Sequence, residues 1–117
     1  MNDLRDRTRA FALRIIRLAE ALPASMAARV IGGQVIRSGT SVGAQYREAW
    51  RSRSDAELIS KLDSVLQELD ETSYWLELLA DAKIVRATRL APLQQEASEL
   101  TAIFVTIVKK LKARKRR

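Results

Sequence analysis

The chain has 117 residues and a formal net charge of +7, and apolar residues make up 47% of it. That length suits one domain with a single hydrophobic core. The absence of Cys and His excludes disulfides, zinc sites and the Ser-His or Cys-His pairs of nucleophilic enzymes. No apolar run reaches the roughly 18 residues of a membrane span, and the charged start MNDLRDRTRA lacks a signal-peptide core. We therefore expect a cytoplasmic, non-enzymatic protein without a cofactor, a metal or a small-molecule substrate.

The excess positive charge is confined to the end of the sequence. Residues 109–117, KKLKARKRR, hold seven of the 21 Lys and Arg, and the other fourteen balance the fourteen Asp and Glu. We divide the chain into a four-helix body, residues 1–111, and a basic C-terminal tail, residues 112–117.

The first predicted helix runs from about Leu4 to Ala21. Its apolar residues recur at spacings of three, four or seven, which marks one buried stripe. Pro23 ends the helix because proline disfavours a helical conformation in the residue before it. Ser25 is the expected N-cap of the next helix.

The second predicted helix runs from about Met26 to Arg51, and its helical period continues through its glycines. Gly39 and Gly43 form a GxxxG row that would let another helix approach closely. Side chains of a helix lean toward its N-terminus, so the Tyr46 ring is expected over the space that these glycines leave. A ligand pocket over the bare backbone is the alternative to close packing.

The last two predicted helices have recognisable starts. Ser54 and Glu57 form a capping box for the third helix, which runs to about Ala80. The fourth helix should begin between Thr88 and Pro92, because proline is tolerated only in a first turn. Four helices joined by short links predict an all-α, up-and-down antiparallel four-helix bundle.

Two segments carry more apolar surface than one bundle hides. Trp75, Leu78 and Leu79 fall off the main face of the third helix. Residues 102–108, AIFVTIV, which include Ile103 and Val105, are apolar nearly all round. Such surface usually marks an interface, and a second copy of the chain is the simplest partner. The alternative is a wide core that leaves Trp75 half exposed.

Residues 37–84 carry a distinctive set of motifs. They include Ser41-Val42-Gly43-Ala44, Tyr46 with Glu48-Ala49, Lys61-Leu62, and Glu71-Thr72 followed by Tyr74-Trp75-Leu76-Glu77-Leu78-Leu79. This segment resembles the four-helix-bundle family of large-subunit (23S) rRNA intervening-sequence proteins, and residues 93–112 resemble the last helix of that family. The family often has Asn where Gln45 stands.

The resemblance implies a four-helix bundle that assembles into rings, commonly homopentamers. It also implies a bacterial gene, either inside an insertion of an rRNA gene or standing alone. A related accessory bundle protein of diversity-generating retroelements binds nucleic acid through a basic ring surface. No enzymatic activity is established for the group.

Two functions are compatible with these features. The first is binding of RNA or DNA, mostly through phosphates, by basic residues of the second helix and of the chain end. The candidate residues are Arg47, Arg51, Arg53, Lys109, Lys110, Lys112, Arg114, Lys115, Arg116 and Arg117. A basic helix end also complements the helix macrodipole and aids solubility, which is the simpler explanation of the tail. The second function is a scaffold that docks a partner protein without binding nucleic acid.

Charged residues of the motif region allow two interpretations as well. Glu48, Arg51, Lys61, Glu68 and Glu71 would form either a functional cluster or salt bridges between helices or subunits.

Overall fold

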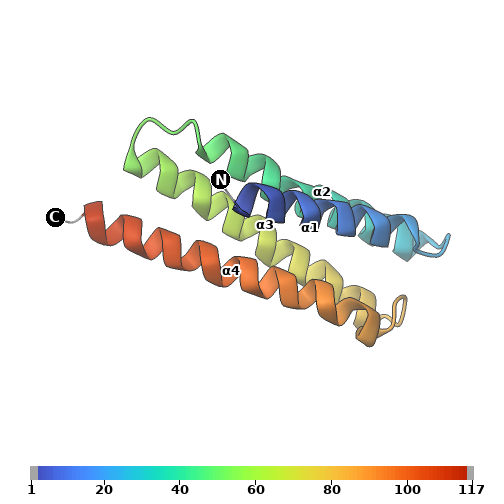
Figure 1. Ribbon diagram of the computed structural model, residues 1–117. Helices are drawn as coiled ribbons and strands as arrows, with labels where there is room; N and C mark the ends of the chain where they lie inside the picture. The colour runs from blue at the N-terminus through green and yellow to red at the C-terminus, as the bar shows by residue number, and fades with distance from the viewer. Residues whose placement is uncertain (1–2, 116–117) are drawn as a thin grey trace.

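The computed structural model describes residues 3–115, and it consists of four helices joined by short links (Figure 1). They are α1 (Asp3–Glu20), α2 (Met26–Ala49), α3 (Asp55–Asp81) and α4 (Ala87–Lys115). Each helix runs antiparallel to the one before it, and the molecule measures 52 × 24 × 21 Å. The predicted all-α antiparallel bundle is confirmed.

Serine side chains start α2 and α3, as the sequence predicts. Ser25 Oγ accepts a hydrogen bond from the backbone N–H of Ala28, and Ser54 Oγ accepts one from that of Glu57, both at 3.1 Å. The Glu57 carboxylate accepts from the backbone N–H of Arg53 at 3.4 Å, one residue before the predicted cap.

The start of α4 differs from the prediction. The helix begins at Ala87, so Pro92 lies in its second turn and not in its first. A proline there removes the hydrogen bond to the Thr88 carbonyl. Because both residues are exposed, water can hydrate that carbonyl, which is why the helix tolerates the proline.

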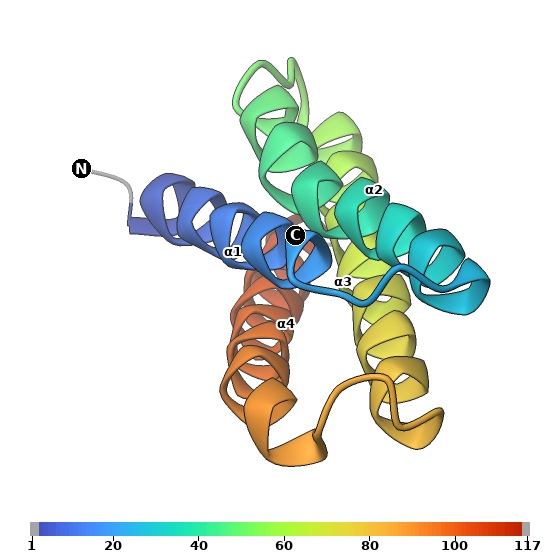
Figure 2. The same ribbon diagram turned by 90° about the vertical axis from the view of Figure 1, so that its right-hand side faces the viewer.

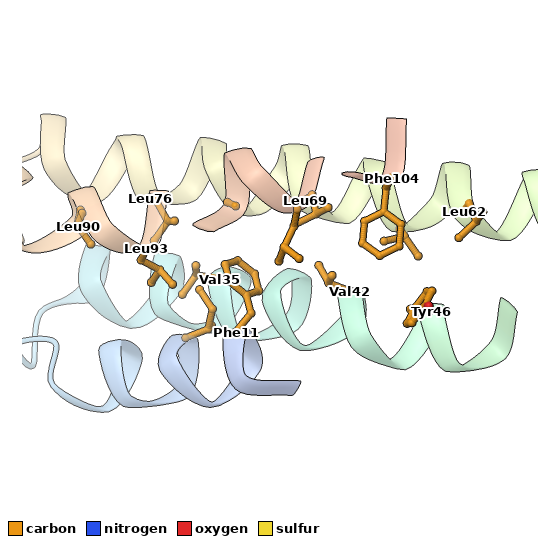
Figure 3. Packing of buried hydrophobic residues seen from close by; sticks show 14 of the residues in the cluster. Phe11, Val35, Val42, Tyr46, Leu62, Leu69, Leu76, Leu90, Leu93 and Phe104 are labelled. Atoms are coloured by element: carbon orange, nitrogen blue, oxygen red, sulfur yellow. The ribbon is translucent and has the colours of Figure 1, made fainter. Parts of the chain in front are cut away.

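One apolar face of each helix builds the core, shown in Figure 3. Phe11 and Ile15 of α1 are fully buried, and so are Leu69 of α3 and Phe104 of α4. The buried residues of α3 recur at alternating spacings of three and four. They are Leu62, Val65, Leu69, Thr72, Leu76 and Leu79.

The glycine row of α2 faces α1. A Cβ atom on Gly39 would lie 2.8 Å from Ile15 Cγ1, and one on Gly43 would lie 3.2 Å from Thr8 Oγ1. The predicted position of Tyr46 over these glycines is wrong, because Ile15 and Thr8 already fill that space. The Tyr46 ring instead packs edge-to-face against Phe104 of α4, with a centroid distance of 5.3 Å.

The bundle has unequal ends because α1 is the shortest helix, with 18 residues against 24, 27 and 29. Figure 1 shows that α1 starts short of the end at which α3 begins and α4 finishes. We call this end, formed by the last turn of α2, the link to α3, the first turns of α3 and the last turns of α4, the three-helix end. Figure 2 shows the first turns of α1 diverging from the other helices.

Candidate nucleic-acid interface

The basic residues that the sequence singles out gather at the three-helix end, although they come from distant parts of the chain. Residues 47–57 and 109–114 contain seven Arg and Lys against three Asp and Glu. All seven basic side chains are exposed. They are Arg47, Arg51, Arg53, Lys109, Lys110, Lys112 and Arg114. The fold therefore brings the three arginines of residues 47–57, a stretch that also holds three acidic residues, beside the basic end of α4 more than 50 residues away.

Residues 112–115 of the predicted tail belong to α4, which continues as a helix through Lys115. Arg114 is also not free. Its Nη2 and Nε atoms donate to Asp55 Oδ1 and Oδ2 at 2.8 and 3.1 Å, and this ion pair raises the pKa of Arg114. The Lys115 side chain, Arg116 and Arg117 lie outside the described part of the chain.

Three arginines from two regions of the chain line one hollow, which we call the arginine hollow. Arg5 comes from α1, Arg47 from α2 and Arg51 from the link to α3. Trp50 and Glu48 also line it, and its volume is about 440 Å³. Arg5 was not among the predicted residues. Its place could have been inferred from the antiparallel pairing of the first two helices, which sets the start of one beside the end of the other.

The arginines of this hollow have no acidic partner among residues 3–115, since no carboxylate there lies within 4.0 Å of Arg5, Arg47 or Arg51. Arg7 differs, because it donates to the Glu96 carboxylate, which raises the pKa of Arg7. The positive charge around the hollow is therefore available to an anionic ligand.

Trp50 is the most exposed aromatic residue of the described chain, with 59% of its surface accessible. It caps the C-terminus of α2, where its backbone N–H donates to the Arg47 carbonyl at 3.3 Å. Its ring lies edge-on to Tyr46 at a centroid distance of 6.2 Å. Besides the arginine hollow, Trp50 lines a cleft of about 860 Å³ beside α1 and a groove of about 480 Å³ that reaches Leu111. More than half of the Trp50 surface is therefore accessible to a ligand in these hollows.

The charged residues of the motif region do not form one cluster. Glu68 and Glu71 of α3 both pair with Arg37 of α2. Glu71 also accepts from Trp75 Nε1 at 3.1 Å, and Glu68 accepts from the Gln45 amide at 3.3 Å.

The other predicted members, Glu48, Arg51 and Lys61, take no part in this network. Arg51 has no carboxylate within 4.0 Å among residues 3–115. It follows the end of α2 and lines the arginine hollow with Arg5 and Arg47.

One predicted interface residue lies inside the chain's own core. Leu79 is fully buried, because it continues the three-four spacing of buried positions along α3. Trp75, Leu78, Ile103 and Val105 keep part of their surface accessible. Further exposed apolar side chains are Leu13, Met26, Val30, Ile36 and Tyr74, and the Tyr74 ring contacts that of Trp75 at a centroid distance of 5.1 Å.

Two further properties concern the described residues alone. Within residues 3–115, no group of three or more Asp and Glu side chains is placed to hold a metal ion. None of the helices in this range is both long enough and apolar enough to cross a membrane.

The chain is similar to known proteins in both sequence and structure. Residues 2–106 match the family described as 23S rRNA-intervening sequence protein. A crystal structure of a protein of unknown function of the S23 ribosomal protein family, from Bacteroides thetaiotaomicron, superposes with a TM-score of 0.84. It is 35% identical, and the match covers 90% of this chain and 97% of that chain. No curated protein sequence matches. The family match over nearly the whole chain, together with this structural likeness, shows that the chain belongs to the 23S rRNA-intervening sequence proteins.

Proposed function

We propose that this protein is a non-enzymatic, self-assembling bundle that binds nucleic acid, RNA above all, through its three-helix end. The arginine hollow is the observation that carries this proposal. Three arginines that have no carboxylate within 4.0 Å among residues 3–115 line it, beside an exposed tryptophan. The exposed Arg and Lys side chains of the three-helix end support a polyanionic partner such as RNA.

Binding of this kind is mainly electrostatic. Arginine and lysine side chains neutralise phosphates and release counterions, so affinity falls steeply as salt rises. Phosphate contacts fix the position of a strand without reading its sequence. We therefore expect little sequence specificity from Arg47, Arg51 and Arg53 or from the exposed lysines of α4.

Self-assembly would strengthen a weak site, because several basic ends would act on one strand. The partly accessible apolar side chains Trp75, Leu78, Ile103 and Val105 support an interface between copies. The family resemblance favours a pentamer. Light scattering should give five times 13.2 kDa, and a monomer at every concentration would refute self-assembly.

The test of binding is a salt titration with a labelled 20-nucleotide single-stranded RNA, followed by fluorescence anisotropy. The test variant is Arg5→Gln/Arg47→Gln/Arg51→Gln. Each phosphate contact to a single strand contributes about 0.7 to the slope of log K against log salt, so losing three contacts per copy should flatten the slope by about 2.

The matched control removes the same three charges at the opposite end of the bundle. Arg29, Arg86 and Arg89 are exposed there and have no salt bridge within the described chain. Arg29→Gln/Arg86→Gln/Arg89→Gln should keep the wild-type slope. If both triple variants weaken binding equally, net charge alone attracts the RNA. If the wild type binds no RNA at moderate salt, the scaffold function replaces this proposal.

A further inference from the structure

We propose that the nucleic acid is single-stranded and that one unpaired base stacks on the Trp50 ring. This inference rests on the proposed function and adds the class of ligand and the residue that selects it. It concerns the same three-helix end. Its new element is that the Trp50 ring binds a base, whereas the arginines bind phosphates.

Trp50 is placed as an exposed stacking surface. The centroid of its ring lies 6.2 Å from that of Tyr46, and Tyr46 in turn contacts the fully buried Phe104 at 5.3 Å. Three rings therefore connect the core to the surface. Because the Trp50 and Tyr46 rings are nearly perpendicular, at 78°, and 59% of Trp50 stays accessible, the indole can accept a planar partner.

Three arginines line the same hollow as this ring. Arg47 lies three residues before Trp50 and therefore on the same side of α2. Arg51 follows Trp50 directly, and Arg5 reaches the same hollow from α1. Its volume of about 440 Å³ lies within the range of pockets that hold small ligands. A base on Trp50 would thus place its phosphates among guanidinium groups.

A duplex does not expose the base face that would stack on Trp50. Paired bases have both faces covered by their neighbours, whereas an unpaired base exposes a face that can stack on an aromatic side chain. A tryptophan among basic side chains is therefore a feature of single-strand binding. The phosphate contacts alone would serve single strands and duplexes alike.

The hollows around Trp50 hold acidic as well as basic residues. Glu48 lines the arginine hollow, Asp3, Asp6 and Arg9 line the adjoining cleft beside α1, and Arg53 and Asp55 line the groove that reaches Leu111. The phosphates next to the stacked base should therefore contact the arginines, while the carboxylates repel them.

The experiment compares a labelled 12-nucleotide single-stranded RNA with the duplex of the same sequence. Stacking of one base is worth about 1 to 3 kcal/mol by substitution, so Trp50→Leu should weaken single-strand binding about 5- to 150-fold. Duplex affinity should change less than about twofold. Trp50→Phe, which keeps an aromatic face, should retain most of the single-strand preference.

Tyr74→Leu is the matched control, because Tyr74 is a 52% exposed aromatic residue of α3 that lines none of the hollows around Trp50. It should leave the ratio of single-strand to duplex affinity unchanged. Since that ratio is compared, a change in assembly that scales both affinities does not affect the result.

Three outcomes separate the two proposals. If the wild type binds neither RNA, the proposed function fails and this inference fails with it. If the arginine variant weakens binding while Trp50→Leu leaves the ratio unchanged, the function stands and the stacking site is refuted. If Trp50→Leu instead lowers the mass seen in light scattering, Trp50 is a contact between copies, which also overturns the stacking site.

Discussion

Gly39 of α2 lies directly against Ile15 of α1, so closely that a Cβ atom on the glycine would stand 2.8 Å from Ile15 Cγ1 and 2.9 Å from Cγ2. Ile15 is fully buried and branched at Cβ, so it cannot swing away. The close contact between the first two helices therefore depends on the missing side chain at position 39.

We expect Gly39→Ala to destabilise the protein, although alanine gains about 1 kcal/mol of helix propensity over glycine. Overpacking costs about 1 to 3 kcal/mol, so the net loss should be up to about 2 kcal/mol, and Gly39→Leu should lose more. Denaturant unfolding followed by circular dichroism measures both.

Gly33 provides the control on the same helix, because nothing lies within 4 Å of a Cβ atom placed there. Gly33→Ala should stabilise the protein by up to about 1 kcal/mol. Equal effects of alanine at positions 33 and 39 would contradict the close-approach interpretation.

A second prediction concerns the buried hydroxyl pair between α2 and α3. Thr72 Oγ1 lies 2.8 Å from Ser38 Oγ and 2.7 Å from the Glu68 carbonyl oxygen, and neither side chain is exposed. Thr72→Val keeps the shape but leaves the Ser38 hydroxyl without this partner, at a cost of about 1 to 2 kcal/mol.

The double variant Ser38→Ala/Thr72→Val should recover part of that loss, because it leaves neither hydroxyl unpaired. A double-mutant cycle from urea unfolding gives the coupling. If the loss of unfolding free energy in the double variant equals the sum of the losses in the two single variants, the hydroxyl pair does not couple the helices.

Sequence reasoning succeeds here wherever the signal is local. The apolar period and the serine caps depend on residues within one helix, so the four helices and their order could be predicted. The family resemblance was confirmed by the match over residues 2–106.

What could not be predicted depends on contacts between helices. Leu79 was placed off the core, because the centre of the buried face of α3 is set by its neighbours and not by its own sequence. Tyr46 turns to Phe104, which lies 58 positions away in the chain, because α1 occupies the space over the glycines. The arginine hollow forms because Arg5 lies beside Arg47. That placement depends on how α1 packs against α2, which the sequence of either helix alone does not specify.

A third prediction concerns Arg7, which ties α1 to α4. Its Nε and Nη2 atoms donate to both Glu96 oxygens at 2.8 and 2.7 Å, and Nη2 also reaches Glu99 at 2.8 Å. Such two-pronged pairs are stronger than single exposed ones. Arg7→Gln should cost about 1 to 2 kcal/mol. Arg9→Gln, which removes an exposed arginine without a salt bridge among residues 3–115, should be nearly neutral.

This cluster should also make the stability depend on pH. Hydrogen bonds from the Gln95 amide and from Arg7 lower the pKa of Glu99 below its ordinary value of 4.5. A group whose pKa is lower in the folded state stabilises the protein above its unfolded pKa, and that contribution is lost as pH falls through the folded value. Glu99→Gln should therefore flatten the fall of Tm below pH 4.5. If Tm of Glu99→Gln falls below pH 4.5 as steeply as that of the wild type, Glu99 does not have this role.

The last prediction separates the end of α4 from the arginine hollow as the source of affinity. A truncation after Leu111, the last buried residue of α4, removes five positive charges: Lys112, Arg114, Lys115, Arg116 and Arg117. Because exposed terminal residues bury little surface, oligomeric state and Tm should change little. If the end of α4 contacts two or three phosphates per copy, the salt slope for single-stranded RNA should fall by about 1.4 to 2.1.

Asp55→Asn provides the opposite change in the same measurement. Asp55 holds Arg114 through two hydrogen bonds at 2.8 and 3.1 Å, so the substitution frees that guanidinium for phosphate. The affinity should rise, and the slope should steepen by up to about 0.7, the contribution of one contact. The same substitution in the truncated chain lacks Arg114 and should leave the slope unchanged. If truncation alters neither slope nor affinity, the end of α4 only aids solubility, and binding belongs to the arginine hollow alone.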